Sequence, residues 1–392
     1  METMEIERTN TLKIPIVEEI IEKLKSNNLN EYEYLWRYAE ELKSSNPGST
    51  VEIMVTRGEL LTAVGIDGNN QKYPIAWAVV ESESTDSWIW FFDLLLKDIG
   101  FSDGFGLTII SDMQKGLVEA VGLVFPEAEH RLCARHWYNN WSTKCKGDAL
   151  RNQFWNCANT TYPEKLDLNI PKLDTIMDGA AKRAISIPVQ KWTKAFINAT
   201  PKCDIIENNT CESFISSILS LSAMEESIIT LLELIRVMIM KRIACARRFV
   251  KKWHQNISPN AKRLLELRKS ECHEWHTVFN GGYGYEVSFG DSGFRNRQAI
   301  DIRDSCSCRL WNISGIPCTH VLCAIYYSHL NLEDYISHWY KKDTYVKAYQ
   351  FGIQNLRGIE SWVSDNQYKV LPPNVGRPPL GRPKIVRREV RE

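Results

Sequence analysis

The feature that most constrains this chain is a short run of metal-ligating residues toward its C-terminus. Two pairs of such residues stand on either side of a Gly-Ile-Pro turn, and together they are Cys306, Cys308, Cys318 and His320. Thiolate and imidazole are the ligands of tetrahedral structural zinc sites. The alternative, ordinary buried cysteines, requires a C-x-C pair to be followed within a dozen residues by a C-x-H pair, across this turn, by chance. We therefore predict a zinc site here, and we assign Cys323, one helical turn past His320, to packing.

Composition limits the class of protein. The 392 residues are 44% hydrophobic and 24% charged, which predicts two or three folded domains with sizeable cores. The net charge is zero, so the chain is not a uniformly basic nucleic-acid binder. Eleven cysteines, with no apolar signal segment behind Met1, predict a reducing compartment. The most apolar stretch, 227–249, is interrupted by charges such as Glu233 and Arg236, which indicates a core helix and no membrane span.

The order of helical and strand patterns predicts a mixed α/β sheet in one domain, because strands that first pair as a meander later alternate with helices. Residues 85–87 are expected to cap a helix that stops at Gly100. The predicted elements are two helical patterns within 15–45, an extended piece at 51–56, a hairpin with strands at 60–66 and 74–82, a helix at 87–99, a strand at 107–112, a helix at 115–125, a strand at 130–133 and a helix at 134–144.

Four blocks of the sequence resemble, in the same order, blocks of the Mutator-like element (MULE) transposases. They are residues 58–95, 107–141, 207–218 and the cysteine-rich segment. The last block resembles the SWIM-type zinc finger, C-x-C-x(n)-C-x-H, whose family role is binding DNA or protein. The resemblance covers roughly residues 30–385. It implies an RNase H-like catalytic domain, a helical insertion and a zinc finger behind it.

Together these observations predict an α/β RNase H-like mixed sheet that lacks its first strand, an all-α insertion, and a small zinc-stabilised SWIM-type module. The expected domains are an N-terminal helical segment at 1–50, a MULE transposase-like core at 51–145, a helical insertion with the third acidic residue at 146–270, the SWIM-type finger at 271–345, and a C-terminal region with a basic tail at 346–392.

The resemblance implies DNA cleavage and strand transfer by two divalent metal ions held by three carboxylates, for which Mg²⁺ or Mn²⁺ is suited. Asp112 matches the second acidic residue, at the end of a buried strand, and its alternative role is a helix N-cap. Glu212 is the best candidate for the third, although a Glu in the first turn of any helix favours the macrodipole. Both are assigned as catalytic residues of an incomplete triad.

The first acidic residue is where the sequence departs from the family. The strand with a G-x-D-like motif that should precede residues 58–66 is missing. Asp67 cannot replace it, because it matches the turn of the hairpin. Glu52 is the nearby carboxylate on a strand-like segment. Loss of a metal-binding carboxylate leaves developing charge uncompensated, so we predict that cleavage is lost.

A second-tier site is predicted at Cys133 and His136, which match a C-x2-H element in this region of the family. Two residues cannot complete a tetrahedral metal site alone. The alternative is that His136 is a helix residue packing against Trp137 or Trp141.

The tail is the basic part of the chain. Two Gly-Arg-Pro units there could enter the narrow minor groove of A·T-rich DNA, whereas a plain disordered basic tail would bind DNA without sequence preference and with strong salt dependence. The candidate DNA-binding residues are Arg377, Arg382, Lys384, Arg387 and Arg388.

The sequence thus predicts a transposase-derived, catalytically inactive nuclear protein that binds zinc through the finger and binds DNA, either A·T-rich or with terminal inverted repeats, or a protein partner. The alternative is an active DDE-type transposase that cleaves and joins DNA with Mg²⁺ or Mn²⁺.

Overall fold

The computed structural model describes residues 31–52, 59–219, 228–290 and 297–362. Several predictions made from the sequence lie outside these residues. They are the first helical pattern within 15–45, most of the extended piece at 51–56, and the basic tail residues Arg377, Arg382, Lys384, Arg387 and Arg388.

The predicted hairpin is present. Strands β1 (Glu59–Ile66) and β2 (Lys72–Val80) pair antiparallel. In the turn between them, a carboxylate oxygen of Asp67, Oδ1, accepts hydrogen bonds from the backbone N–H groups of Asn69 (2.9 Å) and Gln71 (2.8 Å). This is the way an Asp stabilises a turn, so the assignment of Asp67 to the turn is confirmed.

A second pair of strands follows, as the sequence predicts. Strand β3 (Thr108–Ser111) lies parallel to β4 (Glu129–Leu132). Parallel strands need a crossover connection, which helix α4 (Lys115–Val124) supplies.

Helix α3 (Thr85–Ile99) precedes this pair and corrects one prediction. Its N-cap is Ser84, whose hydroxyl accepts a hydrogen bond from the Ser87 N–H (3.1 Å), and not a residue of 85–87. Every residue of 84–87 is a good cap former, and the sequence does not distinguish among them. The predicted C-terminal stop is confirmed, because Gly100 adopts a left-handed conformation with φ 72°.

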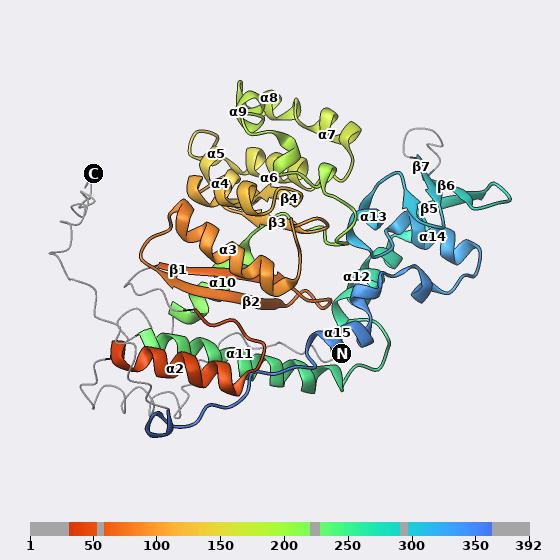
Figure 1. Cartoon of the computed structure of the whole chain (residues 1–392). Coiled ribbons are helices and arrows are strands. Elements are labelled where there is room, and N and C mark those ends of the chain that lie inside the picture. Colours follow the sequence, from red (N-terminus) through yellow and green to blue (C-terminus); the bar gives the residue numbers. More distant parts are fainter. Residues whose placement is uncertain (1–30, 53–58, 220–227, 291–296, 363–392) are drawn as a thin grey trace, which may run out of the picture.

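The two strand pairs share one hydrophobic core but not one hydrogen-bonded sheet. Among the described residues no strand connects β1–β2 with β3–β4, and Figure 1 shows both pairs with α3 and α4 in the same part of the molecule. The shared core joins them into one unit, and aromatic residues of α3 pack in it. Its members are Leu61, Val80, Trp88, Phe91, Phe92, Leu117, Ala120, Val121, Val124 and Phe125, with Ile109 of β3 packed against them.

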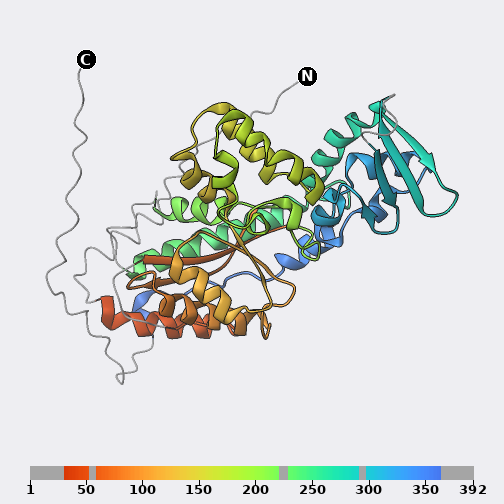
Figure 2. The same ribbon diagram turned by 90° about the horizontal axis from the view of Figure 1, so that it is seen from above.

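The helices after β4 form a separate core. Trp192 is fully buried there and stacks on Phe154, with ring centroids 4.9 Å apart. Figure 2 shows these short helices as a cluster of their own beside the strands. They are α5 (Ala134–Ser142), α6 (Asp148–Ala158), α7 (Pro163–Asn169), α8 (Lys172–Ile176) and α9 (Ala180–Ala184).

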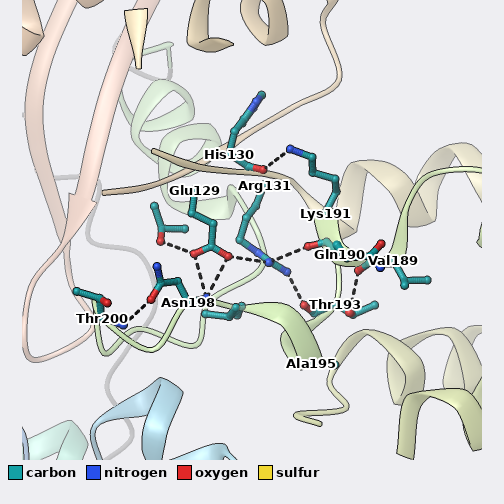
Figure 3. Close-up of polar contacts among 12 residues, drawn as sticks. Glu129, His130, Arg131, Val189, Gln190, Lys191, Thr193, Ala195, Asn198 and Thr200 are labelled. Atoms are coloured by element: carbon teal, nitrogen blue, oxygen red, sulfur yellow. Dashed lines mark hydrogen bonds and ion pairs between the residues drawn. The ribbon is translucent and has the colours of Figure 1, made fainter. Parts of the chain in front are cut away.

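A buried arginine fixes β4 to this helical part (Figure 3). The guanidinium of Arg131 has a side-chain exposure of 2% and pairs with Glu129 at 2.9 Å. It also donates to the backbone carbonyls of Gln190 (2.9 Å) and Thr193. Glu129 in turn accepts from the Asn198 N–H at 3.1 Å. The segment around residues 189–198 is therefore held against the strand that leads to Cys133.

Longer helices cover another side of the molecule. Helix α2 (Glu31–Ser45) lies along α11 (Ile228–Val250) in Figure 1. The charges that interrupt the apolar stretch have partners: Arg236 pairs with Glu233 at 2.7 Å, and Glu233 accepts a hydrogen bond from the Tyr38 hydroxyl at 2.7 Å. Within the described ranges, none of the helices combines the length and the apolar character of a membrane span. Helix α10 (Asn209–Leu219) precedes α11, and α12 (Pro259–Ser270) follows it.

The C-terminal module is a small antiparallel sheet with helices against it. The strands follow one another in the order β5-β6-β7-β8, and Figure 1 shows the module at one end of the molecule. Its elements are β5 (Trp275–Phe279), β6 (Gly284–Phe289), β7 (Arg297–Asp301), β8 (Ser305–Cys306), α13 (Leu310–Ser314), α14 (Thr319–Tyr327) and, beyond them, α15 (Lys342–Ala348).

Candidate functional site

The four predicted zinc ligands meet at one point of the C-terminal module. Cys306 ends β8, and Cys308 follows in the next turn. Cys318 is the N-cap of α14, which places His320 in the first turn of that helix. Gly315 makes the turn between the two pairs with φ 68°, a conformation that favours glycine. The local sequence therefore delivers one pair from a strand end and its turn, and the other pair from a helix start.

The distances between the ligand atoms suit a tetrahedral ion. Sγ of Cys306 lies 3.5 Å from Sγ of Cys308 and 3.8 Å from Nδ1 of His320, which is 3.7 Å from Sγ of Cys318. Zinc bonds of about 2.3 Å to sulfur and about 2.0–2.1 Å to nitrogen place tetrahedral ligand atoms about 3.5–3.8 Å apart. All four ligand atoms lie within 4.8 Å of one another, and Cys323 is not among them. The residues present fit zinc.

The electrostatics of the cluster also favour a cation. Burial raises the pKa of the Cys318 thiol to about 12. Hydrogen bonds from the Cys306 and Cys318 thiols lower the pKa of Cys308. A single thiolate is thus stabilised by its neighbours, whereas three adjacent buried thiolates need a positive charge between them.

The C-terminal module contacts the helical part through the turn that contains Cys308 and Arg309. The Thr161 hydroxyl donates to the Cys308 carbonyl (2.5 Å), and the Arg309 guanidinium donates to the carbonyls of Ile197 (3.0 Å) and Ala195. A cavity of about 400 Å³ lies beside this contact, and His320 is among its lining residues. The zinc ligands therefore stand at the junction of the two parts.

Asp112 lies where the sequence predicts it, directly after β3. Its Oδ1 accepts a hydrogen bond from the Gln114 N–H at 3.0 Å. The N-cap of α4 is Gln114, whose side chain accepts from the Leu117 N–H, so the alternative role of Asp112 as N-cap is wrong. Among the described residues Asp112 belongs to no group of three His, Cys, Asp or Glu with ligand atoms within 4.8 Å.

Two carboxylates near Asp112 were not predicted. Glu59 begins β1, and its Oε2 accepts a hydrogen bond from the Glu83 N–H at 2.6 Å. Burial, and then the charges of Glu59 and Asp112, raise the pKa of Glu83. Both residues lie within the block 58–95, but nothing in its spacing marks them, and the fold alone brings them into this acidic neighbourhood. Glu52, the other carboxylate considered, is exposed and lines an apolar cavity that Asp112 does not reach.

Glu212 joins the second-tier pair. It lies in the first turn of α10, and its Oε1 is 3.4 Å from Nε2 of His136. Cys133 completes a group of three whose ligand atoms all lie within 4.8 Å of one another. The alternative for His136 is confirmed in one respect, because His136 lies in helix α5. Its packing against Trp137 or Trp141 stays a prediction.

These observations define a chain with a Cys3His zinc-binding module next to a domain that carries two pairs of strands. Comparison with protein families then names the parts. The family model of the MULE transposase domain matches residues 25–140, and that of the SWIM zinc finger matches residues 285–329. No curated protein matches the chain significantly. The predicted resemblance is confirmed: the chain is a transposase-derived protein with a MULE transposase domain and a SWIM zinc finger.

Proposed function

We propose that this protein binds zinc through the SWIM finger, binds DNA in the nucleus, and does not cleave it. The observation that carries the proposal is the contrast between the two sites. The finger brings four ligands to zinc-like distances, whereas Asp112 shares no three-ligand group in the described residues and Glu212 faces Cys133 and His136.

The fold proposed for the transposase domain is an RNase H-like sheet that lacks its first strand. The order hairpin, α3, β3, α4, β4 supports it. In the part of the chain that the structure describes, the separation of β1–β2 from β3–β4 is what removal of a strand between the two pairs would leave. That strand would have carried the first catalytic Asp, so its loss and the loss of cleavage have one cause.

In the finger, zinc would be held by Cys306, Cys308, Cys318 and His320 and would stabilise the packing of β8 against α14. Fixed ligands at the junction with the helical part make the finger a rigid platform for a partner. DNA is the partner that the transposase domain and the finger together favour, and the basic residues after position 376 would add contacts to phosphates.

The acidic neighbourhood of Asp112 favours a second candidate, an active DDE-type transposase. Glu59 and Glu83 would have to replace the missing carboxylate and hold Mg²⁺ or Mn²⁺ with Asp112. In that case Glu83→Gln and Asp112→Asn would each abolish metal-dependent nicking. Our proposal predicts no nicking for either variant or for the unmodified chain.

DNA binding is tested by fluorescence anisotropy with A·T-rich and G·C-rich duplexes over a series of salt concentrations. Replacing the basic tail residues by Gln in the full chain should weaken binding. The slope of log K against log salt should become less steep by about 0.9 for each phosphate that the tail no longer neutralises. The variant positions are Arg377, Arg382, Lys384, Arg387 and Arg388.

The matched control replaces Lys182 and Arg183, two exposed basic residues of α9, by Gln and should leave affinity and slope unchanged. Unchanged affinity and slope in the tail variant would show that the tail has no role in DNA binding. Absence of DNA binding by the unmodified chain at low salt would overturn the proposed function, and a protein partner would then be the remaining role for the finger.

A further inference from the structure

A second group of metal-ligating side chains lies outside the finger. It consists of Cys133, His136 and Glu212, which come from two separate points of the chain. Cys133 stands between β4 and α5, His136 lies in the first turn of α5, and Glu212 lies in the first turn of α10. Neither family match assigns a role to the three together.

Backbone contacts bring the two helix starts together. The Ala134 N–H donates to the Ile206 carbonyl at 2.9 Å, and the Asn208 N–H donates to Sγ of Cys133 at 3.2 Å. The segment that enters α10 is therefore tied to the segment that enters α5. The Cys133 N–H also donates to the Ser111 carbonyl at 2.7 Å, which places the group beside the end of β3.

Two polar atoms of the group lack a hydrogen-bond partner. Nδ1 of His136 and Oε1 of Glu212 are buried and make no hydrogen bond. A buried carboxylate oxygen is costly unless something satisfies it, and a metal ion bound at Oε1 would do so for Glu212. Cys133 is fully buried, whereas the side chains of His136 and Glu212 have exposures of 34% and 42%. The group is thus closed behind the thiol and open to solvent on the other side.

The spacing of the group suits one metal ion. Oε1 of Glu212 and Nε2 of His136 are 3.4 Å apart. Zinc bonds of about 2.0–2.2 Å to nitrogen and carboxylate oxygen place two tetrahedral ligand atoms about 3.4 Å apart. A thiolate and an imidazole beside one carboxylate select zinc or cobalt over magnesium, which prefers oxygen ligands.

We propose that Cys133, His136 and Glu212 form a second zinc site with three protein ligands and an open position that water fills. Three ligands and a solvent-facing fourth position distinguish it from the closed four-ligand finger. The site joins the first turn of α5 to that of α10 and so fixes α10, which packs on β1 and β2. It also engages Glu212 as a zinc ligand. This inference does not depend on DNA binding or on the loss of cleavage.

The test measures the zinc content of the purified full chain by inductively coupled plasma mass spectrometry. A titration of the metal-free chain with Co²⁺ accompanies it. We expect two zinc ions per chain. Cys133→Ser and Glu212→Gln should each reduce the content to one, and Cys306→Ser should remove the other. In the Co²⁺ titration, the last equivalent bound by the unmodified chain should be missing in Glu212→Gln. That variant keeps the size of the side chain, and its far-ultraviolet circular dichroism should match the unmodified chain.

The matched control is Cys211→Ser, which removes a neighbouring half-buried thiol outside the group and should retain both metal ions. A chain that binds one equivalent of zinc and of Co²⁺, lost entirely in Cys306→Ser and unchanged in Glu212→Gln, would overturn the inference. Two equivalents that both survive in Cys133→Ser and Glu212→Gln would overturn it as well, because the second ion would then lie elsewhere.

Discussion

Replacement of Arg131 by alanine should loosen the contact between β4 and the helical part while the rest of the fold persists. The side chain is almost fully buried and has three partners: the Glu129 carboxylate and the carbonyls of Gln190 and Thr193. The variant removes the ion pair and leaves a carboxylate and two carbonyls without this donor.

The magnitude follows from what remains. Removing one partner of a buried ion pair costs about 3–5 kcal/mol. Glu129 would keep its hydrogen bonds from the Thr108 hydroxyl (2.7 Å) and the Asn198 N–H (3.1 Å), so its carboxylate would lose its counter-charge but keep two donors. We therefore expect a loss at the lower end of this range, about 3 kcal/mol of local stability. This loss raises the equilibrium constant for local opening about a hundredfold.

Native-state hydrogen exchange followed by mass spectrometry measures this equilibrium locally. Peptides that cover residues 129–132 and 189–198 should lose about a hundredfold in protection, and peptides from the finger should be unchanged. The control is Arg135→Ala, since that arginine is half exposed in its ion pair with Glu207 and should change protection less than about threefold. Protection in Arg131→Ala that stays within the same threefold range would refute the reasoning.

Two further predictions concern pH and zinc. Burial, with a smaller effect of the Lys191 charge, lowers the pKa of His130 to about 4. The unfolded chain therefore binds this proton at higher pH than the folded chain, and stability should fall by about 2 kcal/mol between about pH 6.5 and 4 after allowance for partial solvent access. The free energy of unfolding of His130→Gln, measured by denaturant titration, should lack this part of the pH dependence. If the variant and the unmodified chain lose the same free energy of unfolding between about pH 6.5 and 4, the prediction is contradicted. Cys306→Ser and His320→Ala should release the zinc of the finger to a weak chelator, whereas Cys323→Ser should retain it. Loss of that zinc in Cys323→Ser would assign a ligand role that the four-residue cluster does not give it.

The parts of this protein that depend on local sequence were predictable. The zinc ligands stand in one short motif with its own turn, and the structure brings the same four residues together. The elements from the hairpin to α5 follow from the periodicity of apolar residues, and α11 follows from one long amphipathic pattern.

The parts of the protein that depend on contacts between residues distant in the sequence were not predictable. Arg131 appears in the sequence as an ordinary strand residue, and only the fold places carbonyls from residues 190 and 193 around it. Glu83 lies near both Glu59 and Asp112, a proximity that no spacing in the sequence indicates. Cys133 and His136 were predicted as a pair, but the contact with Glu212 needs the segment before α10 to return to α5.

The central claim, that this transposase-derived chain does not cleave DNA, is tested most directly by nicking of supercoiled plasmid in Mn²⁺. A single nick converts the plasmid to the open circle, so weak activity is visible. We predict no conversion above a metal-free control, and no difference between the unmodified chain and Asp112→Asn. Mn²⁺-dependent nicking that Asp112→Asn abolishes would contradict the claim and would identify an active transposase.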